Sequence, residues 1–582
     1  MIRIVLILNL LFFSCVCNSQ SLVDRKELYK KIDKYLTKGT ENGFSGAVLV
    51  AQEGNIILNK GYGLANKELD LLNSPQTIFS TGSVTKQFTA TAILKLVALG
   101  KLKLNDSLQL FFKELPKDKE NITIHQLLTH SAGFLDVIGN GDFDHIPTSE
   151  FFKQLFDTEL RYTPGTKHQY SNASYSILAR IIEIVSELPY EHFLQEYLFK
   201  PAGMLQTGYL IPAWKSANLA QGYHKGITYW RSMVTRFKED GKVSWVLKGN
   251  GGIQSTQEDM FKWYKALKSN KILDVKHTKL LITPYIQEQE GSDESHYAYG
   301  WAIFKSKRNT KMITHNGSNG IFFHEFMWLP KEDVVIIFST NAYSREVEIL
   351  WKLKEMLFNK SYTPKPIQNS PYTLVMKFIK SNSPKQIKEL LTLIRDEFGT
   401  RFNNVNVLNK IGYTLLAGEQ YRDWVVPLFE MNTQMFPKNA NIWDSLGDGY
   451  TAMRDTENAI KAYQKALEID PTISSSIESL GKLGINVKQQ TKSPIKISNI
   501  IMESYLGIYQ LSSGHSINIT RKEDSLFIEF PGRTAMKLSP IVSNKFSIGN
   551  RNATLTFNKN ETEKIISFTI NEGGEEMIAS KK

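Results

Sequence analysis

The sequence holds only two cysteines among its 582 residues, Cys15 and Cys17, and both lie within its first twenty residues. Once that segment is removed, the chain has no thiol for catalysis, for a disulfide or for binding a metal ion. Long apolar runs are absent as well, because the run from Ile4 to Val16 is shorter than the ~20 residues that span a membrane. We therefore expect no integral membrane segment and no thiol chemistry.

The first residues have the pattern of a secretory signal. Arg3 precedes the short apolar run, and small and polar residues follow it. We place the signal at 1–19, with cleavage after Ser19, and a lipoprotein signal cut before Cys15 is the alternative. The mature protein is then expected in the periplasm or outside the cell, lipid-anchored under the alternative.

The net charge of +12 comes from lysines scattered along the chain. No Arg-rich or aromatic-interleaved tract is present, so a nucleic-acid partner is not expected. The sequence also lacks a phosphate loop, an H-E-x-x-H zinc motif and the G-x-S-x-G nucleophile elbow. These absences predict an activity that uses neither a cofactor nor a metal ion.

Three regions follow the signal. Residues 24–360 mix strands and helices, including a hairpin that turns at Gly54-Asn55 and an almost wholly apolar helix at Thr85–Leu99. Residues 370–485 are predicted to be helical. Residues 498–582 show short strands separated by turns, which predicts a small barrel or sandwich after a polar linker. The expected fold class is α+β, followed by a helical region and a small all-β domain.

The helical region carries a repeat signal. Its residues match the tetratricopeptide spacing W-x2-L-G-x2-Y…A-x3-F…P, and a weaker copy lies about 34 residues upstream. Such repeats bind proteins or peptides, so a protein partner is a candidate. The matching residues are Trp443, Leu446, Gly447, Tyr450, Ala459, Tyr463 and Pro471.

Ser83 and Lys86 form the strongest chemical signal. They stand three residues apart at the start of the apolar helix, which places hydroxyl and amine on one face. A serine nucleophile needs a base, and a buried amine with a lowered pKa can serve as one. The helix N-terminus also supplies backbone N–H groups for a developing oxyanion.

Two further motifs stand downstream. Tyr170-Ser171-Asn172 offers a phenol for proton transfer and an amide for positioning, although it also reads as a turn capping the next helix. His315-Asn316-Gly317-Ser318 offers a glycine that lets substrate lie close to the backbone. The N–H of Ser318 is a candidate second donor to the oxyanion, although a hairpin turn explains the same residues.

Taken together, the three motifs resemble the serine β-lactamase and penicillin-binding protein superfamily, and within it the class C-like hydrolases. That group has S-x-x-K, Y-x-N and then K-x-G or H-x-G, in this order. The resemblance covers about residues 40–345 and implies an antiparallel sheet flanked by helices with an all-helical lobe. It implies Ser83 as nucleophile, Lys86 and Tyr170 as proton carriers, and Asn172, His315, Gly317 and Ser318 as substrate-binding residues.

His315 departs from the lysine that β-lactamases carry at this position. The expected function is thus an exported serine hydrolase of peptides, amides or esters, with D-amino-acid or cell-wall peptides favoured. The alternatives are a β-lactamase and a non-catalytic penicillin-recognising protein that presents its repeats to a partner. An unperturbed histidine at position 315 would gain positive charge between pH 8 and 6 and favour anionic substrates.

Residues 209–248, which are rich in aromatics, are the predicted lid over the active site.

Overall fold

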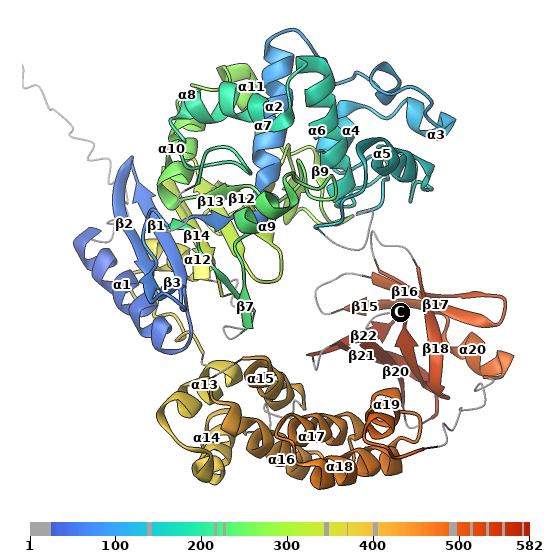
Figure 1. The fold of residues 1–582 in the computed structure, drawn as a ribbon. Helices are drawn as coiled ribbons and strands as arrows, with labels where there is room; N and C mark the ends of the chain where they lie inside the picture. The colour runs from blue at the N-terminus through green and yellow to red at the C-terminus, as the bar shows by residue number, and fades with distance from the viewer. Residues whose placement is uncertain are drawn as a thin grey trace, which may run out of the picture.

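The structure, a computed structural model, describes fourteen stretches of the chain, and Figure 1 colours them in chain order. They are 25–136, 142–214, 218–224, 228–342, 349–368, 370–399, 405–418, 420–487, 497–511, 516–530, 535–549, 553–560, 562–572 and 575–582. The predicted signal at 1–19 with both cysteines lies outside the described residues. So do three of the turns that the sequence predicts between the strands of residues 498–582, at Ser513-Gly514, Pro531-Gly532 and Gly573-Gly574.

The first region is built on one antiparallel sheet of eight strands. Its order is β2-β1-β14-β13-β12-β11-β10-β9, so the N-terminal hairpin pairs with the last strand of the region. The hairpin predicted at Gly54-Asn55 is confirmed. The strands are β1 (Gly46–Gln52), β2 (Asn55–Tyr62), β9 (Ile286–Gln287), β10 (Ser295–Tyr297), β11 (Ala302–Lys305), β12 (Lys311–Ser318), β13 (Phe323–Leu329) and β14 (Val334–Thr340).

Helices cover both faces of this sheet (Figure 1). One face packs on α1 (Arg25–Glu41) and α12 (Ile349–Phe358), whose apolar side chains share a core with β14. Ile367 belongs to the same core, so this packing continues past the predicted end of the region at residue 360. The opposite face packs on the helical lobe that contains α2 (Thr85–Ala98), α6 (Asn172–Ser186) and α10 (Gln257–Lys268).

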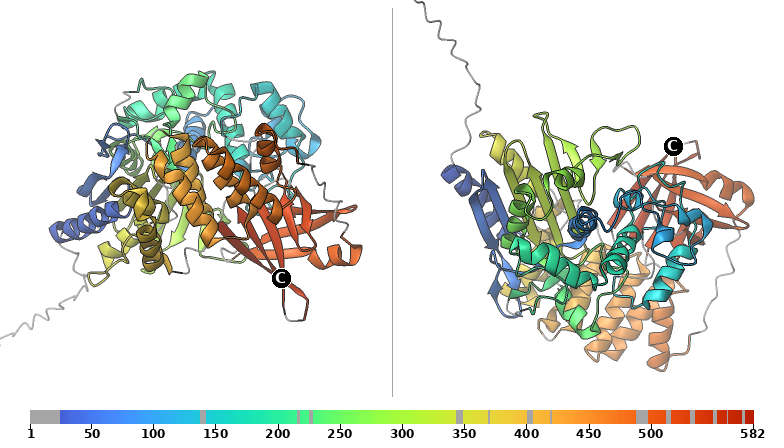
Figure 2. Two further views of the ribbon diagram at one scale, coloured as in Figure 1. Left: turned by 60° about the horizontal axis from the view of Figure 1, so that its bottom comes forward. Right: turned by 90° about the horizontal axis from the view of Figure 1, so that it is seen from above.

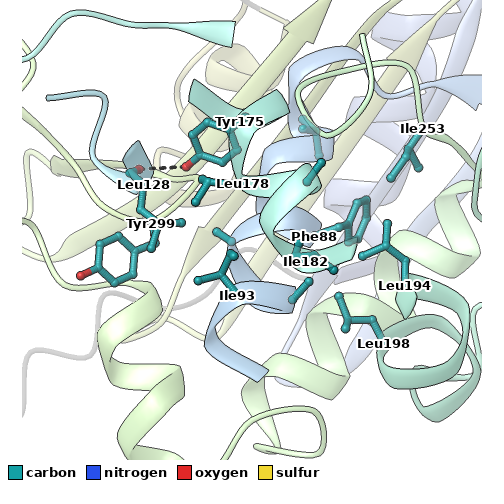
Figure 3. Close-up of a cluster of buried hydrophobic side chains, with 14 of the residues drawn as sticks. Phe88, Ile93, Leu128, Tyr175, Leu178, Ile182, Leu194, Leu198, Ile253 and Tyr299 are labelled. Carbon is teal, nitrogen blue, oxygen red and sulfur yellow. Dashed lines mark hydrogen bonds between the residues drawn. The ribbon is translucent and has the colours of Figure 1, made fainter. Parts of the chain in front are cut away.

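The largest core lies between the sheet and this lobe. The helix predicted at Thr85–Leu99 is observed as α2 and, as expected for an apolar helix, it is buried almost all round. Figure 3 shows Phe88 and Ile93 from α2 packed with Leu178 and Ile182 from α6. This rigid packing fixes the start of α2, where the first sequence motif lies.

In the described residues after the sheet region, the chain forms the α-helices α13 to α19. In two successive helix pairs, a glycine of the first helix lies against an aromatic ring of the second. A Cβ on Gly412 would meet Phe429 at 2.3 Å, and one on Gly447 would meet Tyr463 at 2.4 Å. This shared packing explains the repeat signal physically, and the tetratricopeptide assignment stays a prediction. The helices are α13 (Pro371–Ser381), α14 (Ile387–Phe398), α15 (Asn406–Ala417), α16 (Val425–Met435), α17 (Ala440–Ala452), α18 (Thr456–Ile469) and α19 (Ser474–Lys482).

The last region, after α20 (Asn499–Tyr505), is a closed barrel of eight antiparallel strands that pair in chain order. Closure is completed by pairing of the first strand with the last. The helical region and the barrel lie beside the sheet region in both views of Figure 2, and Arg161 forms an ion pair with Glu529 of the barrel. The strands are β15 (Gly507–Leu511), β16 (Ser516–Lys522), β17 (Ser525–Glu529), β18 (Met536–Val542), β19 (Lys545–Ile548), β20 (Ala553–Lys559), β21 (Ile565–Glu572) and β22 (Glu575–Lys581).

Across the part of the chain that the structure describes, no helix combines the length and the apolar character needed to cross a bilayer. Over the same residues, no group of three or more His, Cys, Asp or Glu side chains is placed to hold a metal ion.

Candidate active site

Ser83 and Lys86 meet where the single turn η1 (Gly82–Val84) leads into α2. Lys86 Nζ donates a hydrogen bond of 3.2 Å to Ser83 Oγ. The lysine side chain is fully buried, which is rare for this residue type. The structure therefore brings together the pair that the sequence predicted, with the amine in reach of the hydroxyl proton.

Burial changes the protonation of Lys86. It lowers the pKa of the amine to about 7, while the negative charges of Asp136 and Asp142 act in the opposite direction. An amine with this pKa is largely neutral at slightly alkaline pH and can accept a proton. The environment thus gives Lys86 the property that a base for Ser83 needs.

Two acceptors hold the amine in place. Lys86 Nζ donates to Asn172 Oδ1 at 2.6 Å and to the carbonyl of Asn250 at 2.7 Å. Asn172 is oriented in turn by Asp136, whose Oδ1 accepts from the Asn172 side-chain amide at 2.9 Å and from its backbone N–H at 3.1 Å. Asp136 was not predicted from the sequence, because a single carboxylate in a loop carries no pattern.

Tyr170 lies on the other side of the amine. Lys86 Nζ is 4.7 Å from the centre of its ring. The Tyr170 hydroxyl is buried and lies near the Ser83 hydroxyl. Burial raises the pKa of this phenol above its ordinary value, although the nearby Ser83 hydroxyl opposes the shift. Tyr170 is therefore a protonated phenol in the free protein and not a phenolate.

His130 supports the segment that carries Tyr170. Its Nδ1 accepts a 3.1 Å hydrogen bond from the Ser171 N–H, and its carbonyl accepts one of 2.9 Å from the Gln169 N–H. Ser171 also caps α6 through a 3.1 Å bond from the Ser174 N–H. The turn interpretation of this motif is therefore correct for Ser171, and it coexists with the contacts of its neighbours.

The third motif lies on β12, directly beside the start of α2. A Cβ on Gly317 would stand 2.4 Å from the Ser83 nitrogen, and one on Gly82 would stand 2.7 Å from the Ser318 nitrogen. Only glycine at both positions allows the strand and the turn to approach so closely. This approach places the backbone nitrogens of Ser83 and Ser318 next to each other, as an oxyanion hole requires.

His315 is buried on β12 and both of its ring nitrogens are engaged. Nδ1 donates to the carbonyl of Asn316 at 2.7 Å, so Nε2 is left to accept from the Tyr297 hydroxyl at 3.0 Å. Burial lowers the pKa of His315 to about 3, and the charge of Lys86 adds to this effect. The expected gain of positive charge between pH 8 and 6 was therefore wrong, because burial keeps the ring neutral throughout that range.

A cavity of about 380 Å³ opens at Ser83. The described part of the predicted lid contributes no residue to its lining, and Tyr209 and Trp245 of that segment are packed in the core instead. The walls come mainly from residues 288–318 and from α12. The lining residues are Ser83, Tyr170, Glu288, Tyr297, Ala302, Phe304, Thr314, His315, Asn316, Gly317, Ser318, Glu325 and Trp351.

The sequence profile of the Beta-lactamase family matches residues 25–354, which is more than half of the chain. The chain therefore belongs to this family of serine hydrolases, which is related to the penicillin-binding proteins. The matched range contains all three motifs and the whole eight-stranded sheet.

Individual relatives agree with this assignment. The chain is similar to the putative penicillin-binding protein PbpX of Bacillus subtilis, with 35% identity over 45% of this chain and 63% of that protein. It is 26% identical to the protein flp of Staphylococcus aureus, over 68% of this chain and 74% of that protein. It is 25% identical to penicillin-binding protein 4* of Bacillus subtilis, over 56% of this chain and 75% of that protein.

Two solved structures were also matched. A penicillin-binding protein from Bacillus halodurans covers 56% of this chain and 99% of its own, with a TM-score of 0.49 and 24% identity. An octameric penicillin-binding protein homologue from Pyrococcus abyssi covers 96% of this chain and 100% of its own, with a TM-score of 0.46 and 19% identity. Both TM-scores lie below 0.5, so the family assignment rests on the sequence match.

Proposed function

We propose that this protein is an exported serine hydrolase that cleaves a peptide, amide or ester through an acyl-enzyme on Ser83, with D-amino-acid or cell-wall peptides as its substrates. The observation that carries this proposal is the 3.2 Å contact between Lys86 Nζ and Ser83 Oγ in a site that lowers the pKa of the amine to about 7. The secretory signal that the sequence predicts at 1–19 supports the export.

In the acylation step, Ser83 Oγ attacks the substrate carbonyl carbon while its proton passes to the neutral amine of Lys86. The carbonyl oxygen gains negative charge between the N–H groups of Ser83 and Ser318. The bond to the leaving group then breaks, and the leaving nitrogen or oxygen takes a proton from Tyr170, which is a better donor than base because its phenol is protonated. Lys86 returns its proton to Tyr170.

In deacylation, water attacks the acyl carbonyl and gives a proton to Lys86. The bond to Ser83 Oγ breaks, Oγ recovers that proton, and the acid product leaves. Asn172 and Asp136 keep the amine directed at Oγ throughout, since each holds the next by hydrogen bonds.

A fluorophosphonate probe followed by peptide mass spectrometry tests this proposal. We expect a covalent adduct on Ser83 and none on Ser83→Ala, which also loses of order 10⁶-fold in turnover, as in other serine hydrolases. Circular dichroism of Ser83→Ala controls for folding. A folded protein that no fluorophosphonate or penicillin probe labels at Ser83 would instead be the binding-only alternative.

A β-lactamase activity is less favoured than peptide or ester hydrolysis. The third motif supplies a neutral, doubly hydrogen-bonded His315 where a permanent positive charge would hold the β-lactam carboxylate. If the protein hydrolyses a cephalosporin as fast as a neutral ester, this preference for esters and peptides over β-lactams is contradicted.

A further inference from the structure

Beyond Ser83, the cavity runs around the edge of β12 to a carboxyl group that the proposed chemistry does not use. Strand β11 pairs with β12 only as far as Ala302 and Thr314, so the later part of β12 forms the cavity edge. Below that edge lies Glu325, which pairs with Asn316 across the β12–β13 ladder.

Glu325 is buried yet lacks a counter-charge. Its side chain is 3% exposed, and its Oε2 has no hydrogen-bond partner among the described residues. Burial raises the pKa of this carboxyl to about 8, and the Trp351 indole opposes the shift only in part. Leaving a buried carboxyl unpaired destabilises a fold, so such a group is a candidate ligand site.

The rest of the lining has the same preference for positive charge. Glu288 supplies a second carboxyl, and Tyr297, Phe304 and Trp351 supply aromatic rings, which attract cations at their faces. Among the residues that the structure describes, the cavity lining contains no lysine or arginine, and its histidine, His315, is neutral. The described lining therefore offers a cationic group more favourable contacts than it offers a carboxylate.

We propose that Glu325, with Glu288 and the ring of Trp351, forms a subsite that binds an ammonium group of the substrate. This inference rests on the proposed hydrolase function and specifies that the substrate carries a positive charge. An ammonium group in the cavity would supply the counter-charge that this carboxyl lacks and stabilise the ionised form of Glu325.

A neighbouring hollow has residues that would favour the opposite substrate charge. Phe304 and Trp351 also line a larger hollow of about 1060 Å³, whose described lining carries five lysines and three carboxylates. If substrates extended into that hollow, its lysines would favour an anionic tail. The two subsites therefore predict opposite charge preferences for the same cleft.

Three p-nitrophenyl esters of similar length separate these outcomes: 6-aminohexanoate (cationic), heptanoate (neutral) and the adipate monoester (anionic). In the wild-type protein we expect kcat/KM to fall in that order. In Glu325→Gln the ratio of cationic to neutral kcat/KM should fall about tenfold or more, because hydrogen bonds to charged groups are among the stronger protein contacts. The exposed Glu294, on the rim of the neighbouring hollow, gives the matched control Glu294→Gln, which should keep the ratio.

An unchanged ratio in Glu325→Gln, or a preference for the adipate ester in the wild type, would overturn the subsite. Calorimetric titration of Ser83→Ala with the three esters tests the same ranking without turnover and without altering Glu325. Absence of turnover of all three esters by the wild type would count against the proposed hydrolase function, whereas the calorimetric ranking would still decide the subsite.

Discussion

The imidazole of His130 lies against the phenol ring of Tyr170, with centroids 4.2 Å apart and planes inclined by 34°. His130 also bonds both neighbours of Tyr170 in the chain through its Nδ1 and its carbonyl. Its φ of 55° lies in the left-handed region, which asparagine tolerates better than most residues. His130 therefore positions Tyr170 without touching the reacting atoms.

We expect His130→Ala to lower kcat about 10–100-fold, because a displacement of about 1 Å at a catalytic group can have an effect of this size. His130→Asn should recover part of the loss, since its Oδ1 can accept from the Ser171 N–H and its backbone tolerates φ 55°. Because His130 acts through Tyr170, KM should change less than kcat. If kcat falls equally in both variants, or if only KM changes, the positioning role is refuted.

Tyr170→Phe keeps the ring packing and removes the proton carrier. General acid–base groups contribute about 10²–10⁴-fold, so we expect kcat for an amide substrate to fall by an amount in this range. An activated ester with a good leaving group needs less protonation and should lose less. If kcat for both substrates is unchanged, Lys86 works alone and Tyr170 is only a packing residue.

The sequence predicted the parts of the site that are local in the chain. Ser83 and Lys86 are three residues apart, and the apolar pattern after them specifies the helix that holds them. Asp136 and the contact of His130 with the Tyr170 segment were not predicted, because their partners, Asn172 and Ser171, lie 36 and 41 residues away. Such contacts leave no periodic signal in a single sequence.

Glu325 was missed for a related reason. It lies in a strand that is apolar apart from Glu325 and His324, and the cavity opens where the pairing of β11 ends on the far side of β12. The charge state of His315 was also beyond sequence reasoning, since burial and the nearby Lys86 amine determine its pKa. The strands and helices themselves followed from apolar patterns, as the β1–β2 hairpin and α2 show.

The pH dependence of acylation should follow Lys86. Only the neutral amine accepts the Ser83 proton, so kcat/KM for a neutral ester should rise about tenfold per pH unit below about 7 and level off above it. Asp136→Asn removes a negative charge that raises the pKa of Lys86, and the profile should therefore shift to lower pH. A profile that is flat from pH 5 to 9, or a shift to higher pH in this variant, would exclude Lys86 as the base.

His315→Lys introduces a cation into the cavity wall. We expect it to raise kcat/KM for a carboxylate-bearing β-lactam or adipate ester relative to the neutral ester, and to lower it for the 6-aminohexanoate ester. His315→Gln, which adds no charge, is the matched control. Identical charge preferences in the lysine variant, the glutamine variant and the wild type would show that this position does not face the charged part of the substrate.

The regions after the sheet domain should be dispensable for small substrates. Their contact with the loop before Tyr170 includes the ion pair between Arg161 and Glu529, whose side chains are 21% and 31% exposed. Ion pairs near the surface contribute about 0–1 kcal/mol, which is too little to hold the site together.

Because Ile367 belongs to the core under α1, the chain should be cut at residue 370 and not at 360. We expect such a chain, once circular dichroism shows it folded, to hydrolyse the neutral ester within about threefold of the full-length rate, a change of less than 1 kcal/mol. Glu529→Gln in the full-length protein serves as the matched variant that breaks only the ion pair. A folded truncated chain with lost turnover would show that the barrel or the helical region helps to build the active site, and loss in Glu529→Gln as well would trace that effect to Arg161.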